Sequence, residues 1–166
     1  MMTDPYMWLA GVIGFIILVW VAKQFLFAPR YPYISKPILT NAELNFYKTL
    51  SALVHEPVLI SFKPRLGDIV DVEEYIRQSD PDWIGRYGAP VWSKHIDFVL
   101  INGHTADVLC CIELDDRSHL KRENAKRDQF KNKALEAADI PLIRIRCQRT
   151  YKKEAVLEKI APYLNI

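Results

Sequence analysis

The 166-residue sequence has few cysteines and no spacing of them that would bind zinc. Cys110, Cys111 and Cys147 are the three present, no Cys-x-x-Cys pair occurs, and the first two are adjacent in an apolar run. Neighbours on a strand point to opposite faces, so these two cannot pair easily. We therefore expect three small core residues without a disulfide partner, in a reducing compartment.

Repeats and low-complexity tracts are also missing, and the formal net charge is only +2. The composition, 50% hydrophobic and 25% charged, is that of an ordinary globular protein. The charge is uneven, because 13 Lys/Arg stand against 6 Asp/Glu between Arg117 and Lys159. A basic C-terminal third suits a partner that carries phosphates, although charged helices are equally often a solvated surface.

Near the N-terminus, an unbroken apolar run extends from Tyr6 to Ala22. As a helix, it has the length needed to span a hydrocarbon layer of about 30 Å. Trp8 and Trp20 lie near its two ends, where aromatic rings favour the membrane interface, and Lys23 can reach the head groups. The run therefore predicts a transmembrane helix.

A cleaved signal peptide is the alternative for this segment. However, no positive side chain precedes the run, and Ala28 is followed by Pro29, which is a poor context for cleavage. Because basic residues follow the run and none precedes it, the positive-inside rule places the N-terminus outside and the remainder in the cytoplasm. We expect a single-pass inner-membrane anchor over 1–28, a proline-rich linker over 29–38 and a cytoplasmic domain over 39–166.

After the linker, hydrophobic periodicity predicts seven main elements of an α/β domain. In chain order, they are a helix that opens at Thr40, strands over residues 57–65, 95–101 and 108–114, a helix over 121–139, a strand over 142–147 and a last helix capped by Thr150. A turn or short helix over 66–75 and a long loop over 77–94 separate the first two strands. Trp83, Tyr87 and Trp92 in this loop either anchor it to the domain or stack on nucleotides.

Carboxylates gather on the second and third predicted strands. Asp97 lies on the second strand with His95 on the same face, and Glu113 and Asp115 share a face of the third. A tight turn at residues 102–104 makes these strands antiparallel neighbours, which brings Asp97 towards Glu113. Such oxygen ligands suit Mg²⁺, and the metal can activate water against a phosphodiester. Alternatively, these acids bond backbone amides or arginines.

Several short motifs of this sequence occur together in one known family. They are residues 39–43 (LTNAE) with Phe46-Tyr47, residues 63–69 (KPRLGDI), 93–100 (SKHIDFVL) and 113–119 (ELDDRSH), Arg127-Asp128 and residues 140–144 (IPLIR). Each is weakly specific alone, but in this order they resemble the Domain of Unknown Function 2726 family. The order of elements resembles the PD-(D/E)XK nuclease superfamily. This resemblance implies a restriction-endonuclease-like mixed sheet flanked by helices, in the order αβββαβα.

The resemblance also implies how a metal would be held. Asp97 and Glu113 would bind Mg²⁺ or Mn²⁺, with the carbonyl of Leu114 as a candidate third ligand. Glu43, on the first helix, would support the metal or its water. Glu43 also has a local explanation, because it stands three residues after Thr40 in the arrangement of a capping box.

One position departs from the superfamily pattern. A lysine is expected at position 115, where this sequence has Asp115. Either Lys131, or secondarily Lys126, supplies the missing positive charge, or His119 acts as a general base near neutral pH. If none of them does so, the domain has lost catalysis and only binds.

Further polar residues are expected around this site. His95 and Asp128 would lie near it, although Asp128 has an equally good role in an ion pair on its own helix. Contacts with the phosphates of a nucleic acid are expected from four basic residues, Arg144, Arg146, Lys152 and Lys153.

Three functions from different classes follow from these residues. The first is a membrane-anchored, Mg²⁺-dependent nuclease acting on DNA, with RNA as the second choice of substrate. The second is a catalytically inactive nuclease-fold module that binds nucleic acid or a protein partner at the membrane. The third is a membrane-tethered interaction protein with no nucleic-acid role. The identity of residue 115 separates the first two.

Overall fold

The computed structural model describes residues 5–26, 31–115 and 122–164, with the backbone alone described for residues 5, 25 and 122–128. The chain divides into two units, Met1–Lys36 and Pro37–Ile166. The first unit contains helix α1 (Pro5–Leu26), in which Tyr6–Gln24 is long and apolar enough to cross a membrane. None of that window is buried within the described residues. The long apolar helix expected from the sequence is confirmed.

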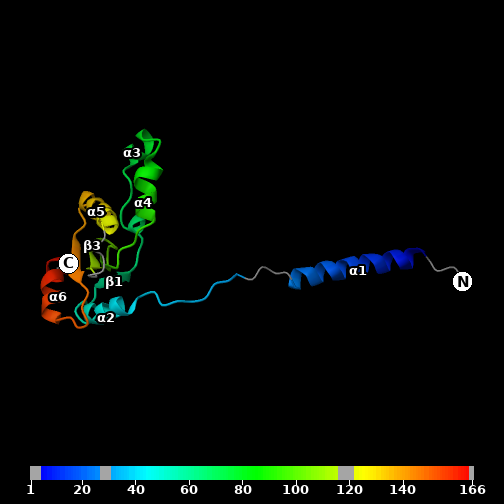
Figure 1. Ribbon diagram of the computed structural model, residues 1–166, viewed down its shortest axis with the longest axis horizontal. Coiled ribbons are helices and arrows are strands. Elements are labelled where there is room, and N and C mark those ends of the chain that lie inside the picture. The colour runs from blue at the N-terminus through cyan, green and yellow to red at the C-terminus, as the bar shows by residue number, and fades with distance from the viewer. Residues whose placement is uncertain (1–4, 27–30, 116–121, 165–166) are drawn as a thin grey trace. The chain divides into compact units, whose positions relative to one another are not determined.

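The second unit is built on a four-stranded mixed sheet (Figure 1). In sheet order, the strands are β1 (Val58–Phe62), β2 (Phe98–Asn102), β3 (Val108–Asp115) and β4 (Leu142–Arg146). The first two pairings are antiparallel and the third is parallel. β3 therefore has a strand on each side, which explains its long apolar run. The turn between β2 and β3 spans residues 103–107, longer than predicted.

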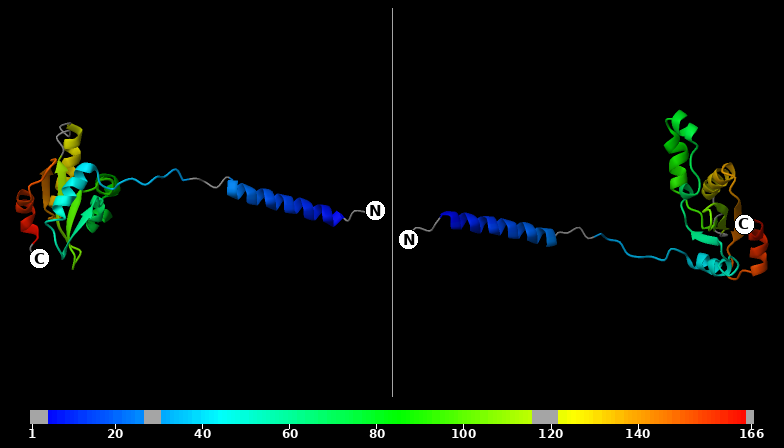
Figure 2. Two further views of the ribbon diagram at one scale, coloured as in Figure 1. Left: turned by 90° about the horizontal axis from the view of Figure 1, so that it is seen from below. Right: turned by 180° about the vertical axis from the view of Figure 1, so that it is seen from behind.

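Helices cover both faces of the sheet (Figures 1 and 2). Helices α2 (Asn41–Leu50) and α6 (Lys153–Ile160) pack on one face, and α5 (Arg122–Ala137) packs on the other. Successive residues of a strand point to opposite faces, so Cys110 belongs to the first core and Cys111 to the second. Both cysteines are buried as predicted, whereas Cys147 is half-buried. The predicted order of the main elements is confirmed.

The N-cap predicted from the sequence is correct for α2 but not for α6. At α2, the Thr40 hydroxyl accepts the Glu43 N–H at 3.3 Å, and the Glu43 carboxylate accepts the Thr40 N–H at 2.7 Å. The predicted capping box is thus confirmed. The predicted cap of the last helix, Thr150, is wrong, because α6 begins at Lys153 with Lys152 as N-cap. Tyr151, between the two positions, is buried in the first core. The conformation of residues 150–152 is therefore set by packing against the core rather than by a local capping signal.

The long loop predicted over residues 77–94 is also wrong, because much of this stretch is helical. Its elements, with those just before it, are η1 (Leu66–Asp68), α3 (Glu74–Ser79), the π-helix η2 (Ile84–Gly88) and α4 (Ala89–Trp92). They form a helical arm, residues 66–92, that projects from the sheet (Figure 1). Pro90 stands in the first turn of α4, where its missing N–H is tolerated. The proline therefore marks a helix start rather than a loop.

The start of the second strand differs from the prediction as well. β2 begins at Phe98, not at residue 95, and residues 95–97 instead run beside the end of β1. The strand alternation does not extend to Ile96, which packs in the second core with Val99 rather than with Phe98. Asp97 therefore lies immediately before β2, at the end of the sheet.

Candidate metal site at the end of the sheet

Asp97 is held through both its main chain and its side chain. Its carboxylate Oδ2 accepts the N–H of Leu114 at 2.9 Å, and its backbone carbonyl accepts the N–H of Lys63 at 3.1 Å. The β2–β3 ladder begins at Phe98 paired with Ile112, so the Asp97 carboxylate takes the place of a strand neighbour for Leu114. The other carboxylate oxygen, Oδ1, accepts no hydrogen bond from the residues that the structure describes.

Glu113 is the buried acid of the site. It lies on β3 with 9% of its side chain exposed, and its Oε2 accepts a hydrogen bond from Lys131 Nζ at 2.5 Å. Its other oxygen, Oε1, is buried and has no partner among the described residues. Burial raises the pKa of Glu113 above its ordinary value, the ammonium of Lys131 opposes this rise, and the nearby charge of Asp97 adds to it.

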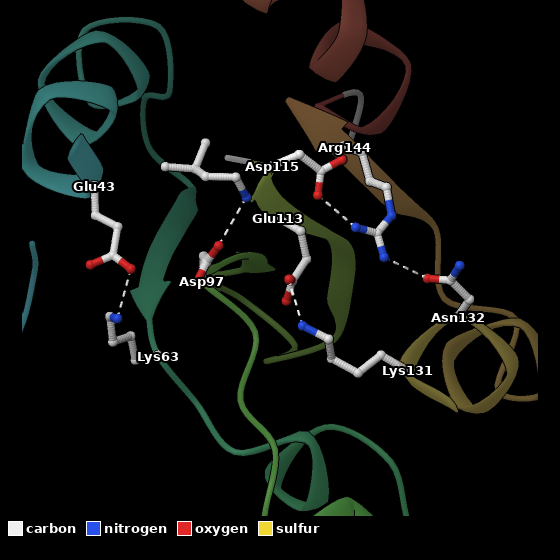
Figure 3. Close-up of polar contacts among 9 residues, drawn as sticks. Glu43, Lys63, Asp97, Glu113, Asp115, Lys131, Asn132 and Arg144 are labelled. Atoms are coloured by element: carbon white, nitrogen blue, oxygen red, sulfur yellow. Dashed lines mark hydrogen bonds and ion pairs between the residues drawn. The ribbon is translucent and has the colours of Figure 1, made fainter. Parts of the chain in front are cut away.

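Figure 3 shows the carboxylates of Asp97 and Glu113 next to each other, with Lys131 reaching Glu113 from α5. The charge of Asp97 is near enough to act on Glu113. The described residues include no group of three or more His, Cys, Asp or Glu suited to a metal. Mg²⁺ is commonly held by one or two carboxylates, with water and substrate oxygens as its other ligands. Two neighbouring carboxylates, one with a buried oxygen that no described residue bonds, fit a hydrated Mg²⁺ or Mn²⁺.

A second acid–lysine pair lies beside this site. The ammonium of Lys63, the residue after β1, is 2.7 Å from Glu43 Oε1, while Glu43 Oε2 accepts the Thr40 N–H. Burial raises the pKa of Glu43, but the bonds from Lys63 and Thr40 and the Lys63 charge outweigh it and lower the pKa below its ordinary value. Both Glu43 oxygens are thus bonded, one to the Thr40 N–H as the capping explanation anticipated and the other to Lys63, which was not anticipated.

Asp115 joins a third charged cluster (Figure 3). Arg144 of β4 donates through NH1 to Asp115 Oδ1 at 2.7 Å and through NH2 to Asn132 Oδ1 at 2.9 Å. Arg144, predicted to contact phosphates, is thus already bonded to protein groups. Asp115 therefore binds Arg144, and Arg144 lies opposite Glu113 in the β3–β4 register, so its positive charge is near Glu113.

The other predicted basic residues are open to solvent. Arg146 at the end of β4 and Lys152 and Lys153 at the start of α6 are exposed, and they form no ion pair with the residues that the structure describes. His95 is also exposed, and its backbone bridges Arg65 at the end of the sheet.

Some predicted site residues cannot be placed. His119 lies outside the described residues, and Lys126 and Asp128 lie in α5 at positions where only the backbone is described. Lys131 is the predicted cation that the structure brings to the acids.

Two residues of these clusters were missed by the sequence reasoning. Lys63 occurs in a motif quoted above, but no role was inferred for it. A usable signal was its position, a charged residue between an apolar strand and Pro64. Asn132 follows Lys131 on α5, and nothing in the local sequence indicates that its side chain meets Arg144.

The fold and the site define a mixed α/β domain with three acid–base clusters at one end of its sheet, preceded by an apolar helix. A family model described as "Protein of unknown function (DUF2726)" matches residues 35–163, so the chain belongs to this family. No curated protein and no solved structure matches the chain.

Proposed function

We propose that the protein is a membrane-anchored, divalent-metal-dependent nuclease of the PD-(D/E)XK type that hydrolyses phosphodiester bonds in DNA, with RNA as the second choice. The observation that carries this proposal is the buried Oε1 of Glu113, which lies near the charge of Asp97 and has no partner among the residues that the structure describes. A buried carboxylate oxygen without a donor is unfavourable, and a bound ion is one way to satisfy it. The order of the main elements, with the acids at the second and third strands, supports the same class.

Each charged group has a defined task in this proposal. Asp97 and Glu113 would hold the metal, which when bound activates water and neutralises charge on the phosphodiester. Lys131, whose side chain is 13% exposed, places a positive charge at Glu113. It thereby substitutes for the superfamily lysine that is absent at position 115, and it stabilises negative charge that develops on the phosphate.

The proposed substrate class is based on exposed basic residues in the C-terminal part of the domain. Arg146, Lys152 and Lys153 present their charges to solvent at the end of β4 and the start of α6. Such cations bind the phosphate backbone without reading its sequence, and their binding weakens as salt rises. We therefore favour a substrate that is recognised by its backbone rather than by its bases.

The location proposed is the cytoplasmic face of the inner membrane. It is supported by the apolar window of α1 and by the basic residues that follow it. A proline-rich chain rises about 3 Å per residue when extended, so a linker of this length would keep the domain within about 30 Å of the anchor.

The test is cleavage of supercoiled plasmid DNA by the full chain in detergent micelles, with Mg²⁺ or Mn²⁺. Asp97→Asn and Glu113→Gln keep the shape of each acid and remove its charge, and each should abolish nicking. Glu136→Gln, on the exposed surface of α5, is the matched control and should nick at the wild-type rate. Nicking that persists in either site variant would show that these acids do not bind the required metal.

A binding module without catalysis remains the second candidate, and a specific observation favours it. Asp115 replaces the superfamily lysine, and its carboxylate is bonded to Arg144. In that case, the full chain would retard DNA in a gel and release it at high salt without cleaving it.

A further inference from the structure

We propose that Lys63, held by Glu43, is a positioning residue that fixes the carboxylate of Asp97 relative to Glu113. The proposal rests on the proposed function insofar as Asp97 is treated as a metal ligand. Lys63 is not assigned contact with substrate or metal, because its ammonium is bonded to Glu43 at 2.7 Å. Its effect on the site passes through the backbone.

The backbone of Lys63 adopts a conformation that needs support. Its φ of 52° lies in the left-handed region, which is unfavourable for a residue with a side chain. The ion pair with Glu43 can hold it there, since 28% of the Lys63 side chain and 12% of the Glu43 side chain are exposed. Glu43 is itself fixed by the capping box with Thr40 at the start of α2.

The segment that begins at Lys63 is bonded to the segment that ends at Asp97. Three backbone hydrogen bonds join them: Lys63 N–H to the Asp97 carbonyl at 3.1 Å, Ile96 N–H to the Pro64 carbonyl at 3.0 Å and Leu66 N–H to the Lys94 carbonyl at 2.7 Å. Lys63 supplies the last of these contacts before the strand β2 begins. The main chain of Asp97 is therefore placed by the main chain of Lys63.

The carboxylate of Asp97 has its second attachment on β3, where it accepts the N–H of Leu114. Leu114 follows Glu113 directly, so this bond sets the distance between the two proposed ligands. If the Lys63 side chain loses Glu43, the left-handed turn can relax and carry the Asp97 main chain with it. The bond to Leu114 then weakens, and the two carboxylates no longer converge on one ion.

The size of the effect follows from what is known of groups that support metal ligands. Loss of such a group typically lowers metal affinity by about 10-fold to 100-fold. Since Lys63 acts through one backbone bond, we expect the lower end of this range. The conservative change Lys63→Arg keeps a cation at Glu43 and should restore most of the affinity.

The experiment uses the full chain in detergent micelles and two readouts. The first is the affinity for Mn²⁺ by titration calorimetry, and the second is hydrogen exchange of the Leu114 amide without metal. Lys63→Met should raise the Kd for Mn²⁺ about 10-fold and speed Leu114 exchange by a similar factor, while Lys63→Arg stays within about 2-fold of wild type. Lys48→Met, an exposed lysine of α2, is the matched control and should change neither.

The exchange readout separates this inference from the proposed function. If wild-type protein binds no Mn²⁺, the metal site is wrong, and Leu114 exchange alone decides whether Lys63 positions Asp97. Unchanged Leu114 exchange in Lys63→Met overturns the inference, whatever happens to metal affinity. If Lys63→Met does not fold, Glu43→Gln breaks the same pair while keeping an oxygen for Thr40, and faster Leu114 exchange is again required.

Discussion

Two acid–lysine pairs lie near each other at the end of the sheet, and they differ in how completely the acid is bonded. Both oxygens of Glu43 have partners, Lys63 and the Thr40 N–H, and its pKa is lowered. Glu113 has one bonded oxygen, at Lys131, and one buried oxygen without a partner among the described residues, and its pKa is raised. The two pairs thus have the same types of side chain, but the surroundings favour the charged form of Glu43 and disfavour the charged form of Glu113.

This difference distinguishes a group that stabilises the fold from a group placed for a ligand. A carboxylate that accepts several bonds in the native state adds stability when charged. A buried carboxylate next to a second acid lowers the stability of the folded protein when it is charged. Such an arrangement is typical of functional sites. The first pair fixes the start of α2 and the end of β1, whereas the second leaves an oxygen to be satisfied from outside.

The largest expected effect separates the two lysines in cleavage assays. Lys131→Met removes the positive charge at Glu113 and should lower the rate at saturating Mg²⁺ by about 100-fold or more. Lys63→Met should lose activity at low Mg²⁺ and recover it as the metal concentration rises. Plasmid nicking measured over a range of Mg²⁺ concentrations gives both values. Equal loss in the two variants at saturating metal would remove the distinction between the pairs.

A smaller effect is expected on stability, with opposite directions for the two pairs. Replacing both members of the first pair, by Glu43→Gln with Lys63→Met, should lower the free energy of unfolding by up to about 1 kcal/mol, because a partly exposed ion pair is lost while the cap at Thr40 is kept. Replacing both members of the second, by Glu113→Gln with Lys131→Met, should leave it unchanged or raise it by about 1 kcal/mol. Urea unfolding of the full chain in micelles provides the comparison. Destabilisation by the second double variant alone would reverse our assignment.

The pH dependence of stability should show the same contrast with the smallest amplitude. The folded-state pKa of Glu43 is below the ordinary value of 4.5, so its contribution is present above pH 4.5 and is lost as the pH falls through the folded pKa. For Glu113 the folded pKa is above 4.5, so its contribution is present below pH 4.5 and is lost as the pH rises through the folded pKa.

The measurement is the free energy of unfolding as a function of pH for wild type and two single variants. Glu43→Gln should reduce the loss of stability that wild type shows as the pH falls below 4.5. Glu113→Gln should reduce the loss that wild type shows as the pH rises above 4.5. Identical pH profiles for the two variants would show that the pairs do not differ in electrostatic balance.

The contrast also explains which parts of the molecule could be predicted from sequence. The capping box of Thr40 and Glu43 is encoded within four residues, and hydrophobic periodicity encodes the order of the main elements. The hairpin between β2 and β3 places Asp97, immediately before β2, at the same end of the sheet as Glu113 on β3. In each case the decisive interaction is local, or is imposed by a turn.

What the sequence did not reveal depends on contacts between distant segments. Lys63 meets Glu43 only because the end of β1 passes the start of α2. Asn132 meets Arg144 only because α5, which connects β3 to β4, packs beside β4. The start of the last helix was misplaced because burial of Tyr151 sets it. The helical arm was misread because Pro90 marks a helix start as readily as a loop.

The central claim is that Asp97 and Glu113 together bind one divalent cation, and a calorimetric titration with Mn²⁺ tests it most directly. For the full chain at neutral pH, we predict one ion per chain, with affinity lowered by about 100-fold or more in Asp97→Asn and in Glu113→Gln. Glu43→Gln should stay within about 10-fold of wild type. Mn²⁺ binding that is undiminished in either Asp97→Asn or Glu113→Gln, or absent from the wild type, would contradict the claim.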